Sequence, residues 1–296
     1  MAFSKPKGID TYHTTPYAAI DVTRPELSTA GKVVFITGGG SGLGLAFAEH
    51  FAKAGSTQIA ITGRRQNVLD EAQKSIQAAY PKTTVLTLQG DVVDRQAVDA
   101  AFKQTHKTFG PIDILINNAG YLPAYEAIGK ESSPEDWWSG FSANVRGSHN
   151  VLSAFLPTAA ADAVVINLTS AAVNAVVPGQ SPYTASKIAA TRLFESFGVE
   201  NPGFRVVNVA PGVVKTSMHE KTIAHFDEKG WPQLPLDDIE LPASYLVWAS
   251  SAEADFIKGK FVWVHWDVDE LKKVIEGTED KQIFSLAVNG IPNLKL

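Results

Sequence analysis

The 296-residue sequence predicts one doubly wound α/β domain, in which a mostly parallel seven-stranded sheet carries helices on both faces. Short runs that are apolar along their whole length alternate with helix-length segments, as expected for parallel strands buried on both sides. A glycine-rich stretch directly follows the first apolar run, where such folds place a ligand-binding turn. The hydrophobic content of 45% is sufficient for one large core at this length.

Apolar runs and helical periodicity set the predicted order of elements. The predicted strands are residues 32–36, 58–62, 84–88, 112–116, 164–168, 204–209 and 260–265. The predicted helices are residues 43–54, 67–80, 95–108, 134–160, 182–199 and 241–250. Residues 217–240 lack clean periodicity and contain two prolines, which predicts a loop with helical fragments. We expect the domain to span residues 28–270, between an arm at 1–27 and a C-terminal extension at 271–296.

Composition excludes several classes of protein. The net charge of −5 argues against a nucleic-acid surface, and no apolar run approaches the length that spans a membrane. The absence of cysteine excludes disulfides, thiolate metal sites and cysteine catalysis, and it fits a cytoplasmic protein. We therefore predict no metal, nucleic-acid or membrane partner. Residues 1–27 have no apolar core, so they are expected to form a surface arm, partly ordered at best, and not a signal peptide.

Residues 37–44, Thr-Gly-Gly-Gly-Ser-Gly-Leu-Gly, lie between the first predicted strand and its helix. Glycines let the backbone approach a pyrophosphate, and the helix N-terminus offers unpaired N–H groups and the positive end of a dipole. A flexible turn without a ligand is the alternative, but open α/β sheets bind ligands at the carboxyl ends of their strands. We therefore predict a Rossmann-like cofactor site that uses Gly38, Ser41, Gly42, Leu43 and Gly44.

The end of the second predicted strand indicates which dinucleotide is bound. An acid about 20 residues beyond the glycines binds the adenosine ribose hydroxyls, whereas an arginine accommodates a 2′-phosphate. Here Arg64 and Arg65 follow the strand, and the nearest following acid, Asp70, already lies on the next predicted helix. Because a guanidinium pairs well with phosphate, this predicts NADP(H) in preference to NAD(H). Two solvated surface arginines are the alternative interpretation.

The pair Tyr183 and Lys187, with Ser170 thirteen residues upstream, indicates the chemistry. Positions i and i+4 share one helix face, so the phenol and the ammonium can reach the same cleft. A tyrosine pKa of about 10 must fall by about 3 units for proton exchange near neutral pH, which needs roughly 4 kcal/mol of differential interaction. A nearby Lys187 and a cationic cofactor ring can supply it. An ordinary amphipathic helix is the alternative.

Together these segments resemble the classical short-chain dehydrogenase/reductase family, across about residues 32–267. The matching pieces are residues 37–44, Asp91-Val92, Asn117-Asn118-Ala119-Gly120, Asn144, Ser170, the Tyr183/Lys187 pair and Pro211 to Thr216. Residues 259–271 resemble fungal-type members, which are often associated with secondary metabolism. Members of the family usually pair through the helices here predicted at 134–160 and 182–199, so a homodimer or homotetramer is expected.

The resemblance implies four catalytic residues. Tyr183 would exchange a proton with the substrate oxygen, and Lys187 would hold the nicotinamide ribose and depress the tyrosine pKa. Ser170 would hydrogen-bond the carbonyl oxygen and stabilise the charge that develops on it. Asn144 would hold a water that links Lys187 to solvent, although a mere helix kink is the alternative.

The resemblance also implies a set of cofactor contacts. Asp91 would bind the adenine amino group, Asn118 would lie beside the adenosine ribose, and Val214 and Thr216 would meet the nicotinamide carboxamide. A helix cap at Asp91 and a turn-stabilising amide at Asn118 are the alternatives. The same motifs add the neighbouring cofactor-binding residues Val92, Ala119, Gly120, Pro211 and Gly212.

The substrate is predicted to be an apolar or aromatic ketone. The walls around the reactive centre are expected from Tyr121, Leu122 and residues 171–177 and 217–238, with Phe226 and Trp231 as a lid. His219 is a candidate second base, but a surface histidine is the preferred interpretation. The tryptophans are assigned to the core or a subunit interface and not to chemistry, at positions 137, 138, 263 and 266.

These features predict an NADPH-dependent carbonyl reductase, reversible with an alcohol and NADP⁺. Two other classes remain open on the same fold: a non-catalytic NADP(H)-sensing regulator, and a redox-neutral reaction such as a cyclisation. The intact Ser170, Tyr183 and Lys187 set argues against a sensor, because sensing requires binding but no proton donor. Fold alone cannot choose among the three.

Overall fold

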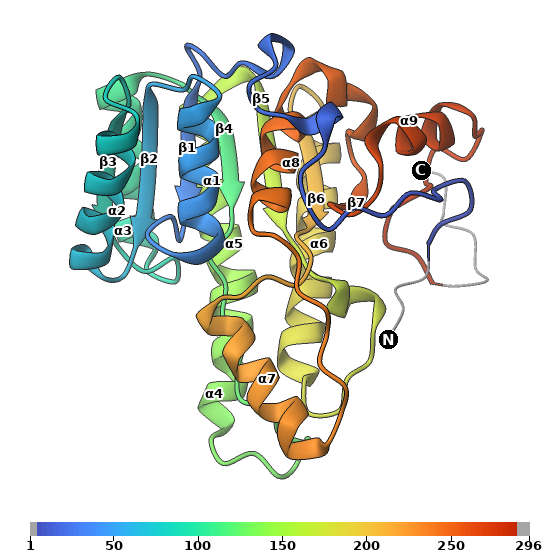
Figure 1. The fold of residues 1–296 in the computed structure, drawn as a ribbon. Helices are drawn as coiled ribbons and strands as arrows, with labels where there is room; N and C mark the ends of the chain where they lie inside the picture. The colour runs from blue at the N-terminus through green and yellow to red at the C-terminus, as the bar shows by residue number, and fades with distance from the viewer. Residues whose placement is uncertain (1–4, 289–296) are drawn as a thin grey trace.

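The computed structural model describes residues 5–288 and has the predicted doubly wound architecture (Figure 1). Within this range the sheet has seven strands in the order β3-β2-β1-β4-β5-β6-β7. Every neighbouring pair is parallel. The strands are β1 Val33–Thr37, β2 Gln58–Gly63, β3 Thr84–Gln89, β4 Ile112–Asn117, β5 Ala159–Leu168, β6 Arg205–Ala210 and β7 Phe261–Trp263. The order reverses direction between β1 and β4, which opens a crevice at their carboxyl ends.

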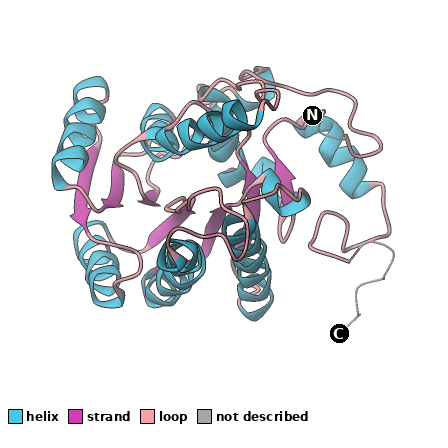
Figure 2. Ribbon diagram, turned by 90° about the horizontal axis from the view of Figure 1, so that it is seen from below, coloured by secondary structure: helices cyan, strands magenta, loops and turns pink. Residues whose placement is uncertain are grey.

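Helices cover both faces of the sheet, as Figure 2 shows. Their bounds are α1 Gly42–Lys53, α2 Gln66–Ala79, α3 Arg95–Phe109, α4 Pro134–Phe141, α5 Gly147–Phe155, α6 Ser181–Glu200, α7 Ser217–Lys229, α8 Glu240–Ser250 and α9 Val268–Glu276. Alternate residues of β1 enter two separate cores: Val34 and Ile36 pack with α1 and α8, whereas Phe35 packs with α3, α5 and α6. The fold class that the sequence predicts is therefore confirmed.

The predicted single helix over residues 134–160 is interrupted. A π-helical turn at Ser142–Arg146 separates α4 from α5, and a 3₁₀ turn at Leu156–Thr158 ends the run because Pro157 cannot continue it. The chain then enters β5 at Ala159, five residues before the predicted strand. The π turn contains Asn144, one of the predicted site residues.

The segment over residues 217–240 is more ordered than predicted. Thr216 caps the N-terminus of α7, since its side chain accepts a hydrogen bond from the His219 N–H, and Gly230 ends the helix in the left-handed region with a φ of 65°. Only residues 231–239 are irregular. Two of the buried positions of α7 are histidines, His219 and His225, so the sequence shows no clean apolar stripe.

The expectation of a loosely ordered N-terminal arm is wrong for residues 5–27. Ile9, Ile20 and Leu27 are completely buried in the same core as the sheet, and Val22 is nearly so. The arm also pairs with the far end of the chain, through hydrogen bonds such as Thr11 N–H to the Glu270 carboxylate at 2.9 Å. Its apolar residues are too widely spaced to give a recognisable pattern. Residues 1–4, and the predicted extension beyond residue 288, lie outside the described residues.

The arm is expected to contribute directly to stability. Replacing the fully buried Ile20 by alanine should lower the free energy of unfolding by about 2–5 kcal/mol, because it removes buried methyl groups and leaves a cavity. The matched control is Ile128→Ala, since the Ile128 side chain is 75% exposed. Equilibrium unfolding in urea would measure both variants. Equal stabilities would contradict the packing of the arm.

Candidate active site

A cavity of about 1100 Å³ lies at the carboxyl ends of the strands, at the point where the strand order reverses. All the predicted cofactor residues line it, as do Ser170, Tyr183 and Lys187 of the catalytic set. Residues from the turns after β1, β2, β3, β4, β5 and β6 meet there, so segments far apart in the sequence share one surface. Of the predicted site residues, Asn144 alone lies outside the lining.

The glycine turn after β1 is a tight backbone cradle. A Cβ on Gly44 would lie only 2.1 Å from the carbonyl oxygen of Gly38, so no side chain fits at that position. Gly38 and Gly42 have φ values of 67° and 55°, which favour glycine. The helix α1 begins at Gly42, and the Ser41 side chain makes no capping hydrogen bond to it. A bare helix N-terminus behind a turn without side chains suits a pyrophosphate.

Asn118 fixes this cradle to the end of β4. Its side-chain Nδ2 donates to the carbonyl oxygens of Thr37 at 2.9 Å and Gly38 at 3.2 Å. The Thr37 hydroxyl in turn accepts from the backbone N–H groups of Asn118 and Ala119 at 3.0 and 2.9 Å. The Asn118 side chain thus stabilises the turn, as the alternative interpretation expected. The position of Asn118 beside an adenosine ribose stays a prediction.

The arginines after β2 and Tyr183, which follows β5, line the cavity on different sides of the point where the strand order reverses. The Arg64 side chain is 74% exposed, and its Nη1 lies 3.9 Å from the Asp91 carboxylate. The Asp91 Oδ1 also accepts from the Val93 N–H at 3.1 Å, while the cap of the next helix is Asp94. Asp70 is occupied on α2, where it accepts from Gln66 at 2.7 Å. Arg64 therefore shares the rim beyond β2 with the Asp91 carboxylate, and both side chains reach solvent.

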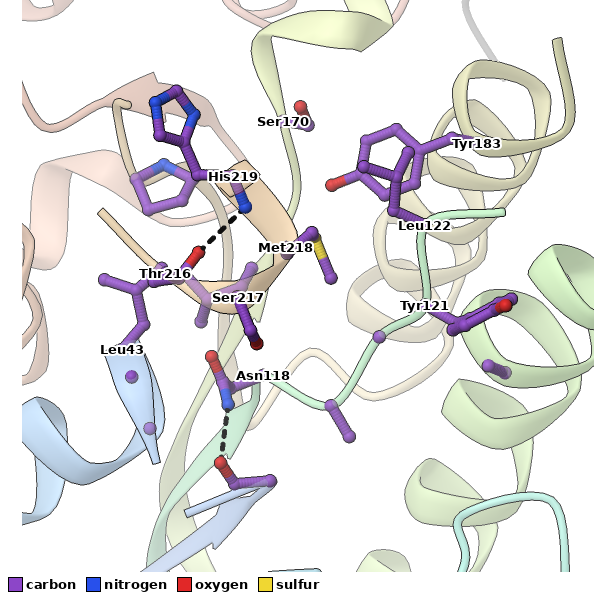
Figure 3. A pocket seen from close by; sticks show the side chains of 18 of the residues that line it. Leu43, Asn118, Tyr121, Leu122, Ser170, Tyr183, Thr216, Ser217, Met218 and His219 are labelled. Carbon is purple, nitrogen blue, oxygen red and sulfur yellow. Dashed lines mark hydrogen bonds between the residues drawn. The ribbon is translucent and has the colours of Figure 1, made fainter. Parts of the chain in front are cut away.

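Tyr183, Lys187 and Ser170 come together at the ends of β5 and α6. Tyr183 and Lys187 are 9% and 7% exposed, and the Lys187 Nζ lies 5.8 Å from the centre of the tyrosine ring. Lys187 Nζ donates to the Leu168 carbonyl at 2.7 Å, which aims the side chain along the cavity floor. Figure 3 shows the hydroxyls of Ser170 and Tyr183 on the same side of the cavity, near Met218.

Burial dominates the proton affinities of this pair. It raises the pKa of Tyr183 to about 12, and the hydrogen bond with Ser170 opposes that rise. Burial also lowers the pKa of Lys187 to about 8. The expected acidification of Tyr183 by Lys187 is therefore not produced by the protein's own groups, because desolvation is the larger effect for both. Further positive charge in the cavity is needed to lower the tyrosine pKa.

Asn144 shapes the cavity from behind its surface. Its side-chain Oδ1 accepts from the Tyr121 N–H at 2.8 Å, and its Nδ2 donates to the Tyr121 carbonyl and the Ser186 hydroxyl, both at 2.9 Å. A Cβ on Gly120 would lie 3.1 Å from the Asn144 Oδ1 and 3.5 Å from the Lys187 Nζ. Asn144 thus holds the segment after β4 against the lysine. Its role toward a bound water stays a prediction.

The helix α7 closes the substrate side of the cavity. The Tyr125 ring stacks on His225 at 4.4 Å, and its hydroxyl lies 3.0 Å from the Thr222 hydroxyl. Lys221 Nζ donates to the Leu122 carbonyl at 3.0 Å. Met218 and Thr222 line the cavity from the predicted wall segment 217–238, whereas the sequence analysis missed Tyr125 and Gln180, because no motif contains them.

Two predictions about side chains near α7 need correction. His219 is 9% exposed and lines the cavity, so it is not a surface histidine, and burial lowers its pKa. Of the two proposed lid aromatics, Phe226 lines the cavity, whereas Trp231 lies outside the lining and packs edge-on against Phe226 at 5.5 Å. Figure 3 shows the hydrogen bond from the His219 backbone to Thr216 at the start of the helix.

The tryptophans divide between core and surface. Trp263 and Trp266 are buried and stack on each other with ring centres 6.2 Å apart. Trp138 is 62% exposed on α4, while Trp137 donates to the Ser181 hydroxyl at 3.1 Å. None of the four lines the cavity, which agrees with a packing or interface role.

Comparison with known proteins decides the family. The model of the family described as short chain dehydrogenase matches residues 32–226, which include most of the sheet and the segments that contain Ser170, Tyr183 and Lys187. The chain belongs to the short-chain dehydrogenase family. This confirms the resemblance seen in the sequence, and membership implies an oxidoreductase that acts between CH–OH and C=O groups with a nicotinamide cofactor.

The similar members of this family include fungal proteins. A short chain dehydrogenase/reductase named AacuD, from Aspergillus aculeatus, is 31% identical over 277 residues, covering 91% of each chain. The short chain dehydrogenase pigC from Monascus ruber is 32% identical over 297 residues, covering 93% of this chain and 92% of the relative. These relatives agree with the fungal-type tail predicted from residues 259–271.

Solved structures show the same fold. Levodione reductase is 26% identical, with a TM-score of 0.73, over 80% of this chain and 96% of that one. A short-chain dehydrogenase/reductase from Serratia marcescens has a TM-score of 0.71 at 24% identity, over 79% of this chain and 96% of that one. No helix among residues 5–288 of this short-chain dehydrogenase has the length and apolar character needed to cross a bilayer.

The low pKa of Lys187 makes stability depend on pH. The folded chain loses this proton near pH 8, whereas an unfolded lysine keeps it up to its ordinary value of 10.5. Between those limits the unfolded chain binds more protons, so the free energy of unfolding should rise with pH by about 1.4 kcal/mol per unit at most. The Lys187→Met variant has no ionisable group at this position, so its free energy of unfolding lacks this pH-dependent contribution.

Urea unfolding of the wild type and Lys187→Met between pH 7 and 10 would measure the effect. The difference between the two free energies of unfolding should shift in favour of the wild type above pH 8. A difference that stays constant across the range would contradict the buried, easily deprotonated ammonium.

Proposed function

We propose that this protein is an NADPH-dependent carbonyl reductase that acts on an apolar or aromatic ketone, with Tyr183 as its acid/base. The proposal rests on one observation above all: Ser170, Tyr183 and Lys187 line the same cavity as the glycine cradle. The residues fit a dinucleotide, because the cradle leaves no room for a Cβ at Gly44 and the rim beyond β2 carries two arginines. NADPH, when bound, supplies the hydride.

The chain's own groups have distinct tasks in the reaction. Ser170 donates a hydrogen bond to the substrate carbonyl oxygen and so holds the carbonyl carbon toward the hydride donor. Tyr183 transfers its proton to that oxygen as the carbon gains the hydride, which completes the alcohol. Lys187 binds the nicotinamide ribose and replaces the proton on Tyr183. In the oxidation direction Tyr183 accepts the proton instead.

The lining of the substrate side favours an apolar ligand. Leu122, Ala172, Met218 and Phe226 face this part of the cavity. Carboxylates of substrates are usually bound by arginine, and among the described residues the arginines of the lining are confined to the rim beyond β2. A ketone with an aromatic or aliphatic body therefore fits better than a sugar or an acid. A role in secondary metabolism remains a prediction consistent with this choice.

Subunit pairing and location complete the proposal. We expect a homodimer or homotetramer in the cytoplasm, paired through α4, α5 and α6. The exposed Trp138 on α4 supports a contact there, because it forms an aromatic cluster with Trp137 and Phe141, and aromatic residues are enriched at interfaces.

Tyr183→Phe is expected to abolish turnover while cofactor binding persists. The variant keeps the ring and loses the proton donor, so kcat should fall by about 10²–10⁴-fold. NADPH oxidation with a panel of apolar ketones, together with product analysis, would measure it. Tyr80→Phe is the control, because Tyr80 ends α2 outside the cavity. Product formed without net NADPH oxidation would favour the redox-neutral alternative, and unchanged cellular function of Tyr183→Phe would favour the sensor.

The combined variant Arg64→Ala/Arg65→Ala tests the cofactor preference. If these guanidiniums bind the 2′-phosphate, losing them should raise the Kd of NADPH about 10–100-fold and leave that of NADH unchanged. Isothermal titration with both dinucleotides measures this difference. The control is Arg95→Ala, since Arg95 is paired with Asp99 at 2.8 Å on α3. Equal losses for NADPH and NADH would overturn the assignment.

A further inference from the structure

A buried Asp–His pair lies behind the turn that follows β6. The Nε2 of His265 is 2.8 Å from the Oδ2 of Asp237, and the two side chains are only 2% and 5% exposed. Neither residue belongs to the lining of the cavity. The pair therefore acts on the site, if at all, through the turn in front of it.

Asp237 makes two hydrogen bonds to the turn, one through its side chain and one through its backbone. The same Oδ2 that meets His265 accepts a hydrogen bond from the Val213 N–H at 2.7 Å. The Asp237 backbone N–H donates to the Val213 carbonyl at 2.8 Å. A buried carboxylate is stable only when hydrogen-bond donors replace the water it has lost. Asp237 therefore keeps its hydrogen bond with the Val213 N–H, which holds the Val213 peptide in one orientation.

Gly212 shows how closely the turn passes over the pair. Its φ is 80°, and a Cβ added there would come within 2.5 Å of the Asp237 Oδ2 and 3.0 Å of the His265 Nε2. The turn thus rests directly on the two side chains. The glycine is required both by its backbone conformation and by this approach.

The N-terminal arm packs against the Asp237–His265 pair as well. The ring of Tyr12 stacks on His265 with centroids 4.4 Å apart and planes inclined by 8°. The next two residues bind the backbone: the His13 N–H donates to the His265 carbonyl at 2.8 Å, and the Thr14 carbonyl accepts from Asp238 at 2.9 Å. Figure 1 shows the N-terminal segment passing near the end of β7. Three distant segments therefore converge behind one turn.

The position of the turn in the sheet indicates which part of a dinucleotide it meets. Pro211, Gly212, Val213 and Val214 follow β6 and line the cavity. The arginines follow β2, four strands away in the order β2-β1-β4-β5-β6, which is about 19 Å at the usual strand spacing. With a phosphate at the arginines and the pyrophosphate at β1, the nicotinamide end lies against the turn.

We propose that Asp237 and His265 are positioning residues, which hold the Pro211–Val214 turn in place for the nicotinamide end of the cofactor and are themselves clamped by arm residues 12–14. This inference rests on the proposed NADP(H) function. It assigns a task to the arm that the catalytic motifs do not suggest: the arm sets the geometry at the reactive end of the cavity from outside it.

Variants at Asp237 separate the hydrogen bonds from the charge. Asp237→Ala removes the acceptor of the Val213 N–H and the partner of His265. Asp237→Asn can place its Oδ1 where the Oδ2 now lies and so keep both hydrogen bonds without the charge. His265→Phe keeps a flat ring for Tyr12 to stack on and removes the contact with the carboxylate.

The experiment titrates each variant with NADP⁺ and with 2′-phospho-ADP-ribose, which lacks the nicotinamide. Asp237→Ala and His265→Phe should weaken NADP⁺ about tenfold, the effect of one lost buried hydrogen bond, and leave the fragment unchanged. Asp237→Asn should restore NADP⁺ binding to within about twofold of the wild type. Fluorescence-detected melting in parallel identifies any variant that fails to fold, and the milder Asp237→Asn and His265→Phe then decide the outcome.

The control is Arg24→Ala. Arg24 also binds the arm to a distant segment, through an ion pair with Glu253 at 2.6 Å, but neither side chain lines the cavity. It should bind NADP⁺ as the wild type does. Variants that weaken NADP⁺ and the fragment equally, or neither, would overturn the positioning role. A wild type that binds neither ligand would instead overturn the proposed function.

Discussion

The hydrogen bonds from Asn118 to the end of β1 are the constraint on which the whole site depends. They join the carboxyl ends of two adjacent strands at the only place in the described sheet where the connections depart in opposite directions. Because the crevice opens there, the glycine cradle, the arginines and Tyr183 can all face one cavity. The Thr37 hydroxyl reinforces the join by accepting two backbone N–H groups. The link extends the pairing of β1 and β4, which ends at Ile36 and Ile116, to the turn that would hold the phosphate.

Burial sets the protonation states of Tyr183 and Lys187. Removing Tyr183 and Lys187 from water pushes both toward their neutral forms, which keeps the phenol protonated and makes the ammonium easy to deprotonate. In the proposed reduction, the protonated phenol of Tyr183 is the proton donor, and a lysine that releases its proton readily can replace that proton. For that proposed reaction, both shifts favour proton transfer from Lys187 to Tyr183 and on to the substrate.

Much of the fold and of the site could be predicted from the sequence. Residues that bind through backbone geometry or through fixed spacing, such as Gly44 and the Tyr183/Lys187 pair, leave a local signature, and the structure brings all of these to one cavity. Residues that act through distant packing leave none. In the sequence, Ile20 and Tyr12 look like parts of a polar tail, because the segments that bury them lie far away along the chain. The helix α7 buries two histidines in place of the apolar stripe by which an amphipathic helix is recognised. The pKa values also depend on burial, which no spacing reveals.

The pairing of the first and last parts of the chain has a consequence for how the molecule is made. Asp10 and Glu270 are hydrogen-bonded across 260 positions of sequence, and Tyr12 bridges to Trp266. During synthesis the early segment emerges from the ribosome long before its partners exist. The side chains of Ile9 and Ile20, buried in the folded chain, are exposed to solvent until then. The arm can therefore reach its final place in a nascent chain only after β7 and α9 have been synthesised.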